Sequence, residues 1–215
     1  EELGHGVSAR VWRARDRVLG REVALKIFEP GEALTPEQRA RFVREARVLA
    51  ACEHENIVRI HSIEERDGKL ELCLELIDGV TLEKLVHDGG VRSAAEAARI
   101  GADLCRALAL LHSHGLVHRD VKPANAMRAQ GGRIVLLDFG LAHATDFSER
   151  RGSAGGTPLF MAPELVSGST ELDGRVDLYS LGVTLYWLVC GKWPYEAASR
   201  EELFLKMERE PPVPL

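Results

Sequence analysis

Short segments in the first third of the chain alternate hydrophobic and polar positions, a pattern typical of strands that bury one face. Glu22–Phe28 and Leu70–Leu76 show it, and the second follows the turn Arg66–Lys69 and the apolar stretch Asn56–Ile60. These segments predict a strand and a hairpin. A glycine-rich turn within Leu3–Val11, followed by alternating residues, predicts another hairpin. The first third of the chain therefore predicts a small sheet.

One helix is expected between these strands. Thr35 can cap its N-terminus, Pro36 suits the first helical position, and Gln38 completes a capping box. The helix should run to about Ala51. The residues at helical spacing that form its apolar face are Phe42, Ala46 and Leu49.

The rest of the chain has a mainly helical pattern. The capping box Ser93–Glu96 opens a helix that ends near Gly115, and Glu201–Arg209 is a further short helix. Asp173–Cys190 is apolar nearly all round, which is typical of a buried helix. Arg133–Leu137 is aliphatic and β-branched, and predicts a buried strand. Together the two parts of the chain predict an α+β fold.

Composition excludes two classes of protein. The 215 residues are 45% hydrophobic, which is enough for a folded globular protein. The net charge of −5, from 28 Lys and Arg against 33 Asp and Glu, leaves no basic excess, so we expect no nucleic-acid partner. The most apolar run, Leu178–Cys190, is too short for a membrane span of about 20 residues, so no membrane segment is expected in this chain.

The cysteines are far apart and form no Cys-x-x-Cys pair, which argues against a zinc site. No signal peptide is visible, so we expect reduced thiols and a cytoplasmic location. The chain lacks an initiator Met, which suggests a piece of a longer protein, and a membrane anchor in that parent is compatible with the pattern. Four residues are expected to be small core side chains: Cys52, Cys73, Cys105 and Cys190.

The residues best suited to phosphate chemistry begin at His118, where the sequence reads His-Arg-Asp-Val-Lys-Pro-Ala-Asn and, after the predicted strand, Asp-Phe-Gly. The carboxylate of Asp138 and the amide oxygen of Asn125 are hard ligands of the kind that Mg²⁺ prefers. Asp120 then remains available to act as a base. Lys122 can neutralise charge on a phosphoryl group in transfer.

These motifs resemble the catalytic loop and Asp-Phe-Gly motif of the eukaryotic-type (Hanks-type) serine/threonine protein kinases. The resemblance implies a two-lobed, protein-kinase-like fold, with an N-lobe over residues 1–77 and a C-lobe over residues 78–215. The N-lobe would be a small antiparallel sheet with one helix, and the C-lobe mainly helical. The chain looks most like bacterial members, and it ends before the last C-lobe helices of the family.

The resemblance also implies roles for individual residues. Asp120 would be the catalytic base, and Asn125 and Asp138 would hold metal. In Val-Ala-Leu-Lys, Lys26 would pair with the α- and β-phosphates of ATP and with a glutamate, Glu45, on the predicted helix. The full set of expected catalytic residues is Asp120, Lys122, Lys26, Glu45, Asn125 and Asp138.

The expected nucleotide site includes a glycine-rich loop, the segment after Leu74 as a hinge, and a floor under adenine. Its residues are Leu3, Gly4, Gly6, Val11, Ala24, Lys26, Glu75, Ile77 and Met127. Three plainer interpretations stay open: an ordinary glycine hairpin, a plain interdomain linker after Leu74, and Met127 as simple core packing. Ala9 replaces the third glycine of the family's loop, which puts the flexibility of that loop in doubt.

The polar segment between Asp138 and Ala162 resembles an activation loop, in which Arg119 would give a phosphate a charge-assisted partner. Thr157 looks like the residue that contacts Asp120 and Lys122. The candidate phosphorylation sites, with the first preferred, are Ser153, Ser148 and Thr145.

Two buried groups are expected to support the catalytic loop. His118 should be structural rather than an acid or base, packing beneath Phe139 as it does in the family. Asp177, inside an apolar helix, would be costly unless hydrogen-bonded. The resemblance implies that its partner is the backbone near His118 and Arg119.

The expected activity is transfer of the γ-phosphoryl group of ATP, with Mg²⁺ or in its place Mn²⁺, to Ser and Thr hydroxyls of proteins. Autophosphorylation through a homodimer is included in that expectation. The alternatives are a catalytically weak nucleotide-binding pseudokinase scaffold and a phosphotransferase for small molecules. The first is disfavoured because every expected catalytic residue is present.

Overall fold

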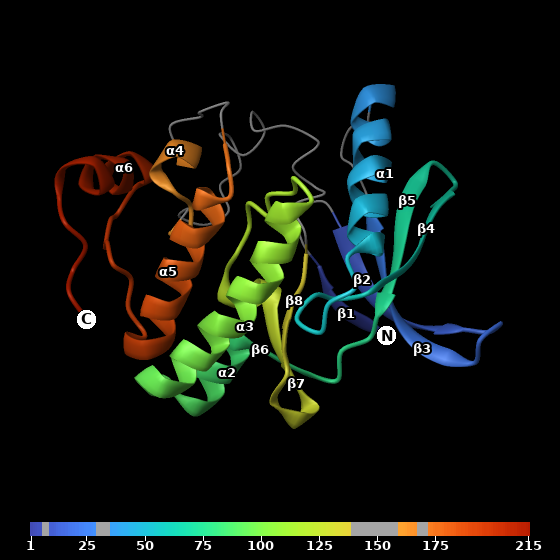
Figure 1. Ribbon diagram of the computed structural model, residues 1–215, viewed down its shortest axis with the longest axis horizontal. Helices are drawn as coiled ribbons and strands as arrows, with labels where there is room; N and C mark the ends of the chain where they lie inside the picture. Colours follow the sequence, from blue (N-terminus) through green and yellow to red (C-terminus); the bar gives the residue numbers. More distant parts are fainter. Residues whose placement is uncertain (6–8, 29–34, 139–158, 167–171) are drawn as a thin grey trace.

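The computed structural model describes residues 1–5, 9–28, 35–138, 159–166 and 172–215. Its elements form two groups that lie side by side (Figure 1). One group is a sheet with a long helix along it, and the other is mostly helices around a smaller sheet. The α+β architecture predicted from the sequence is confirmed.

The larger sheet has five antiparallel strands in the order β1-β2-β3-β5-β4. Both predicted hairpins are present, and the β4–β5 turn uses Asp67 and Gly68 at positive φ. The strands are β1 Glu2–His5, β2 Ala9–Asp16, β3 Arg21–Phe28, β4 Ile60–Arg66 and β5 Lys69–Glu75.

Helix α1 (Pro36–Ala51) packs along this sheet and has the predicted bounds. Thr35 Oγ1 accepts from the Gln38 amide at 3.2 Å, and Gln38 Oε1 accepts from the Thr35 amide at 2.9 Å. Both halves of the capping box are therefore formed. The buried face is the predicted one, and its Phe42 ring meets Phe28 edge to face with centroids 4.7 Å apart.

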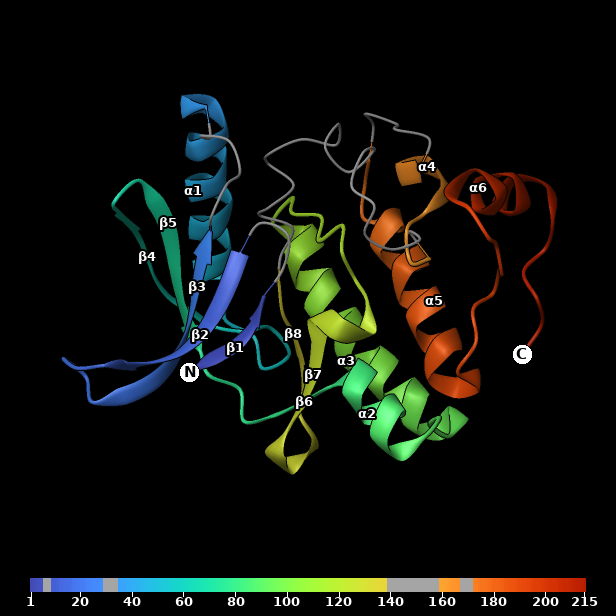
Figure 2. The same cartoon turned by 180° about the vertical axis from the view of Figure 1, so that it is seen from behind.

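The second group is built on two long helices and a three-stranded antiparallel sheet in the order β6-β7-β8 (Figure 2). Both long helices and the buried strand β8 were predicted, whereas α2, β6 and β7 were not. The helices are α2 Leu82–Gly89, α3 Ala94–Ser113, α4 Pro163–Val166, α5 Arg175–Cys190 and α6 Arg200–Arg209. The strands are β6 Gly79–Thr81, β7 Ala126–Ala129 and β8 Ile134–Leu136, with 3₁₀ turns at Pro123–Asn125 and Gln130–Gly132.

Half of the predicted capping box at α3 is formed. The Glu96 amide donates to Ser93 Oγ at 3.2 Å, which caps the helix as expected. The Glu96 carboxylate instead accepts from Arg128 Nη1 at 2.8 Å. A charge-assisted bond to an arginine is the stronger choice for a carboxylate, which explains the difference.

The strand predicted at Asn56–Ile60 is wrong, because β4 begins only at the last of these residues. The segment instead bonds to the other sheet. Asn56 Nδ2 donates to the carbonyl oxygen of Ile134 at 2.7 Å, and the Leu136 amide donates to the Asn56 carbonyl oxygen at 2.9 Å. These bonds satisfy buried polar groups and join β8 to the α1–β4 connection.

The cysteines are free thiols, and only Cys52 is buried as predicted. Cys73 and Cys190 are half-buried, and Cys105 is exposed, which contradicts its assignment to the core. Cys105 follows the fully buried Leu104 on α3, and neighbouring helical positions face different directions.

Within the described part of the chain, no helix has the length and apolar content that a membrane crossing needs.

Asp177 of α5 is fully buried and holds the loop that follows α3. Its Oδ2 accepts from the His118 amide at 2.8 Å, and its Oδ1 accepts from the Arg119 amide at 2.7 Å. His112 Nε2 lies 2.8 Å from Oδ2 as a third partner. The predicted contact between this carboxylate and the loop backbone is confirmed.

Gly79 lets β6 approach β7 closely. A Cβ atom at this position would lie 2.2 Å from the carbonyl oxygen of Arg128 and 2.8 Å from Cα of Ala129. Both neighbours are backbone atoms, which cannot rotate away as a side chain could. The approach therefore requires glycine.

Gly79→Ala is expected to lower the free energy of unfolding by about 2–3 kcal/mol, the upper part of the range for overpacking. Urea denaturation measures the effect. Gly182→Ala is the control, because its Cβ would meet nothing within 4 Å on an exposed face of α5. That change should stabilise by about 0.5–1 kcal/mol. A loss of equal size in both variants would contradict the close approach.

Asp177→Asn is expected to lower the free energy of unfolding by about 3 kcal/mol or more, because hydrogen bonds to a charged group contribute about 1.5–3 kcal/mol each. The amide oxygen can serve one backbone N–H, while its NH₂ faces the other donor. Asp88→Asn on exposed α2 removes the same charge and should change stability by less than about 0.5 kcal/mol. Similar urea midpoints for both variants would show that Asp177 does not support the loop.

Candidate active site

His118 joins the predicted catalytic loop to the end of β8. It is 1% exposed, and its Nε2 lies 2.8 Å from the carbonyl oxygen of Leu137. Because a carbonyl only accepts, Nε2 carries the hydrogen, and Nδ1 is left to accept from the Asp120 amide at 3.2 Å. The structural role predicted for this imidazole is confirmed, while Phe139 lies outside the described residues.

The backbone of Leu137 is also fixed from its other side. Its amide donates to the carbonyl oxygen of Asn125 at 2.8 Å. Asp138 follows directly, with a φ of 48° that few residues other than glycine adopt. The strand end and the catalytic loop are therefore tied together where two expected metal ligands enter the site.

The carboxylate of Asp120 lies between a cation and an amide. Lys122 Nζ lies 3.1 Å and 3.0 Å from its two oxygens, and Asn125 Nδ2 donates to Oδ2 at 2.8 Å. The same Nδ2 donates to the carbonyl oxygen of Asp120 at 2.9 Å. Both partners are acceptors, so the amide orientation is defined, and Oδ1 of Asn125 faces away from Asp120. Three of the expected catalytic residues are thus together.

Lys26 of β3 forms an ion pair with Asp138. The lysine side chain is 11% exposed and its ammonium lies 5.2 Å from the centroid of the Phe28 ring, so it is well shielded from water. The carboxylate is 40% exposed. The expected phosphate-binding lysine and the expected metal-binding carboxylate are therefore neighbours, although they lie far apart in the sequence.

The predicted pair of Lys26 with Glu45 is not formed. Glu45 Oε1 instead accepts from Arg41 Nε at 2.8 Å, one turn earlier on α1. The charge of Lys26 is already matched by Asp138, and an arginine four residues away competes for the glutamate. An exposed pair of this kind contributes only about 0.3–0.5 kcal/mol, so it is a weak restraint on Glu45.

The expected nucleotide residues fall on both sheets. Leu3 and Gly4 are in β1, Val11 is in β2 and buried Ala24 is in β3. Glu75 ends β5, Ile77 follows it, and Met127 lies on β7. In both views β1 lies on the side of the large sheet that faces the small one (Figures 1 and 2). Several predicted residues lie outside the described ones: Gly6, Gly140, Thr145, Ser148, Ser153 and Thr157.

Arg119 is half-buried and has a φ of 63°. Burial lowers the pKa of its guanidinium, and the nearby Arg41 lowers this pKa further, while Glu45 and Asp177 raise it. Its Nε has no hydrogen-bond partner among the described residues. Buried charged groups normally have partners, so this guanidinium is suited to an anion.

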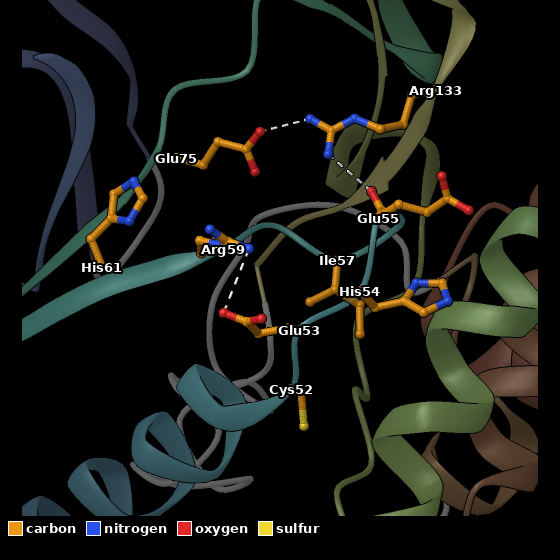
Figure 3. Close-up of a pocket in the computed structure, with 9 residues that line it drawn as sticks. All are labelled: Cys52, Glu53, His54, Glu55, Ile57, Arg59, His61, Glu75 and Arg133. Atoms are coloured by element: carbon orange, nitrogen blue, oxygen red, sulfur yellow. Dashed lines mark hydrogen bonds and ion pairs between the residues drawn. The ribbon is translucent and has the colours of Figure 1, made fainter.

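A cavity of about 520 Å³ is lined by Glu75 at the end of β5 and by Arg133 just before β8, among other residues (Figure 3). Of the predicted site residues, only Glu75 lines it. Sequence reasoning missed the Arg133 and His61 side chains there, because neither belongs to a motif. Burial lowers the pKa of His61, and Arg21 and Arg59 lower it further.

Comparison with known proteins agrees with this geometry. The family model described as protein kinase domain matches residues 1–212. Serine/threonine-protein kinase PknB from Mycolicibacterium smegmatis is 39% identical over 100% of this chain and 35% of its own length. PknB from Mycobacterium tuberculosis is 36% identical with the same coverage. The chain thus spans about a third of the curated relatives it matches.

Two solved structures are also similar. The kinase domain of Mycobacterium tuberculosis PknI, in a variant with one cysteine replaced by alanine, has a TM-score of 0.77 at 31% identity, covering 99% of this chain and 76% of that one. Rad53 residues 1–466 in complex with AMP-PNP has a TM-score of 0.80 at 27% identity, covering 97% and 52%. The fold, the loop around Asp120 and the full-length match lead to one conclusion: the chain belongs to the protein kinase family.

Proposed function

We propose that this chain is the catalytic part of a serine/threonine protein kinase that transfers the γ-phosphoryl group of ATP to hydroxyls of protein substrates, itself included. One observation carries the proposal. The Asp120 carboxylate is oriented by Lys122 and Asn125 beside the strand end that delivers Asp138. The names of the relatives at 36–39% identity support it.

In this proposal Asp120 accepts the proton of the substrate hydroxyl as the hydroxyl oxygen attacks the γ-phosphorus; the bond from this phosphorus to the β–γ bridging oxygen breaks, and ADP leaves. Its bonds to Lys122 and Asn125 restrict the carboxylate to one orientation. Lys122 Nζ lies 3.0 Å from Asp120 Oδ2. In this proposal it is close enough to stabilise negative charge on the phosphoryl group as well. Positioning and charge stabilisation are the main contributions that a protein makes to this reaction.

The residues present fit a divalent cation. Asn125 Oδ1 faces away from Asp120, and Asp138 is partly exposed, so both can offer hard oxygen atoms. A bound Mg²⁺ or Mn²⁺ would neutralise charge on the phosphates. Lys26 now pairs with Asp138, and on nucleotide binding we expect its ammonium to turn to the α- and β-phosphates.

We assign residues 1–77 to an N-lobe and residues 78–215 to a C-lobe, with the nucleotide between them. The adenine would meet the backbone of Glu75–Ile77, with Ala24 above it and Met127 below. Leu3, Gly4, Gly6 and Val11 would cover the phosphates. The division is supported by the two groups of elements, which separate at this point of the chain (Figure 1).

Arg119 is the proposed partner for a phosphate on the segment after Asp138, with Ser153 as the preferred site and Ser148 and Thr145 behind it. The support is its half-buried guanidinium, whose Nε has no partner within the described ranges. Modification of such a site by a second copy of the chain requires a transient homodimer.

We place the reaction in the cytoplasm, where ATP and protein substrates are available.

Transfer of labelled phosphate from MgATP to the chain and to a basic protein tests the proposal. Asp120→Asn should lower kcat by about 10²-fold or more, the contribution of general base catalysis, while nucleotide affinity stays within about twofold. Asp138→Ala should abolish both transfer and the metal dependence of nucleotide binding. Transfer that survives Asp138→Ala undiminished, or phosphate found only on tyrosine, would refute the proposed activity.

Arg41→Gln tests how strongly Glu45 is held away from Lys26. Because the exposed pair contributes only about 0.3–0.5 kcal/mol, releasing Glu45 should raise kcat/KM by at most about twofold. Arg47→Gln removes the same charge from an exposed position of α1 and serves as the control. A tenfold change confined to Arg41→Gln would show that this arginine has a larger role than restraining Glu45.

A further inference from the structure

The short segment Glu75–Asp78 between the two sheets is held at both ends by the turn that joins β7 and β8. At one end, Arg133 Nη2 donates to Glu75 Oε1 at 2.7 Å. At the other, Gln130 Nε2 donates to Asp78 Oδ2 at 2.6 Å, and the Gln130 amide donates to the Asp78 carbonyl oxygen at 2.9 Å. Gln130 and Arg133 of the turn thus hold the two ends of the segment, Asp78 and Glu75.

The turn itself is defined by its backbone. Gly131 and Gly132 have φ of 83° and 90°, which residues with a Cβ rarely adopt. The Ala129 amide donates to the carbonyl oxygen of Arg133 at 2.9 Å and closes the turn. This geometry directs the flanking Gln130 and Arg133 side chains toward the same segment.

Arg133 also contacts the connection between α1 and β4. Its Nη1 donates to the carbonyl oxygen of Glu55 at 3.1 Å, next to Asn56, whose side chain bonds β8 (Figure 3). One planar guanidinium therefore links the hinge to the α1–β4 connection through two fixed donors. The Glu75 and Arg133 side chains are only 31% and 35% exposed, so their ion pair is less screened by solvent than a surface pair.

We propose that Arg133 and Gln130 are positioning residues that fix the Glu75–Asp78 segment from behind and so set the affinity of the site for the adenine base. The inference rests on the proposed function, because it takes the front of this segment as the adenine site. The cavity that Arg133 lines includes Glu75 but none of the expected catalytic residues, and the printed bonds of Gln130 go to Asp78. Their effect should therefore be on base binding alone.

The test measures competition by adenosine and by tripolyphosphate against a fluorescent ATP analogue, together with KM for ATP and kcat. Arg133→Gln should weaken adenosine binding and raise KM by about fivefold, the lower end of typical coupling between sites. Tripolyphosphate affinity and kcat should stay within about twofold, because the phosphate and base-catalysis residues are unaffected. A general loss of structure would weaken both affinities, raise KM and lower kcat together.

Arg128→Gln is the matched control. Arg128 lies on the same hairpin and pairs with Glu96 at 2.8 Å, with a side chain that is 41% exposed, but does not bond the hinge. It should leave adenosine affinity unchanged. Arg133→Lys should restore part of the affinity, since a lysine can keep the charge but not both bonds. Glu75→Gln added to Arg133→Gln should lower adenosine affinity no further, because both changes break the same ion pair between Glu75 and Arg133.

The outcomes separate the two proposals. If the unmodified chain binds nucleotide but transfers no phosphate, the proposed function fails, and the adenosine measurements still decide the role of Arg133. If it binds no nucleotide, both fail. Equal adenosine affinity in Arg133→Gln and Arg128→Gln, or a parallel loss of adenosine and tripolyphosphate binding, would overturn the positioning role.

Discussion

The catalytic loop depends on one buried carboxylate. Asp177 has no exposed surface, and it bonds consecutive backbone amides of His118 and Arg119. Arg119 has a left-handed backbone conformation, which costs about 1–3 kcal/mol for an ordinary residue. The charge-assisted bonds that these amides donate to Asp177 are strong enough to offset that strain. The position of Asp120, the next residue, follows from this balance.

Elements that bury their own side chains could be predicted from the sequence. Helix α1 shows both a capping box and an apolar face, and its bounds were predicted closely. Strand β8 is wholly buried and aliphatic, so its pattern was clear. Asp177 was identifiable because a carboxylate inside an apolar helix requires a donor. In each case the signal lies within about 20 residues of sequence.

The remaining features depend on contacts between distant segments. Asn56–Val58 has a strand-like composition, but its polar groups bond β8 of the small sheet and not a strand of the large sheet. Glu45 was placed on the correct helix, whereas its partner depends on whether Lys26 is already paired. No sequence motif identifies the partners of Arg133, because an isolated arginine after two glycines is compatible with many different contacts. Spacing along the chain carries no information on such choices.

The ion pair between Lys26 and Asp138 has a consequence for how the site responds to ligands. In the proposed site, metal and lysine would compete for the same carboxylate, so only the fraction of molecules with the pair open would be competent to bind metal. Apparent metal affinity is reduced by that fraction. A nucleotide whose phosphates attract the lysine restores it, and by reciprocity the metal strengthens nucleotide binding. In the proposed function, positive cooperativity between metal and nucleotide would therefore follow from the ligand-free charge arrangement itself.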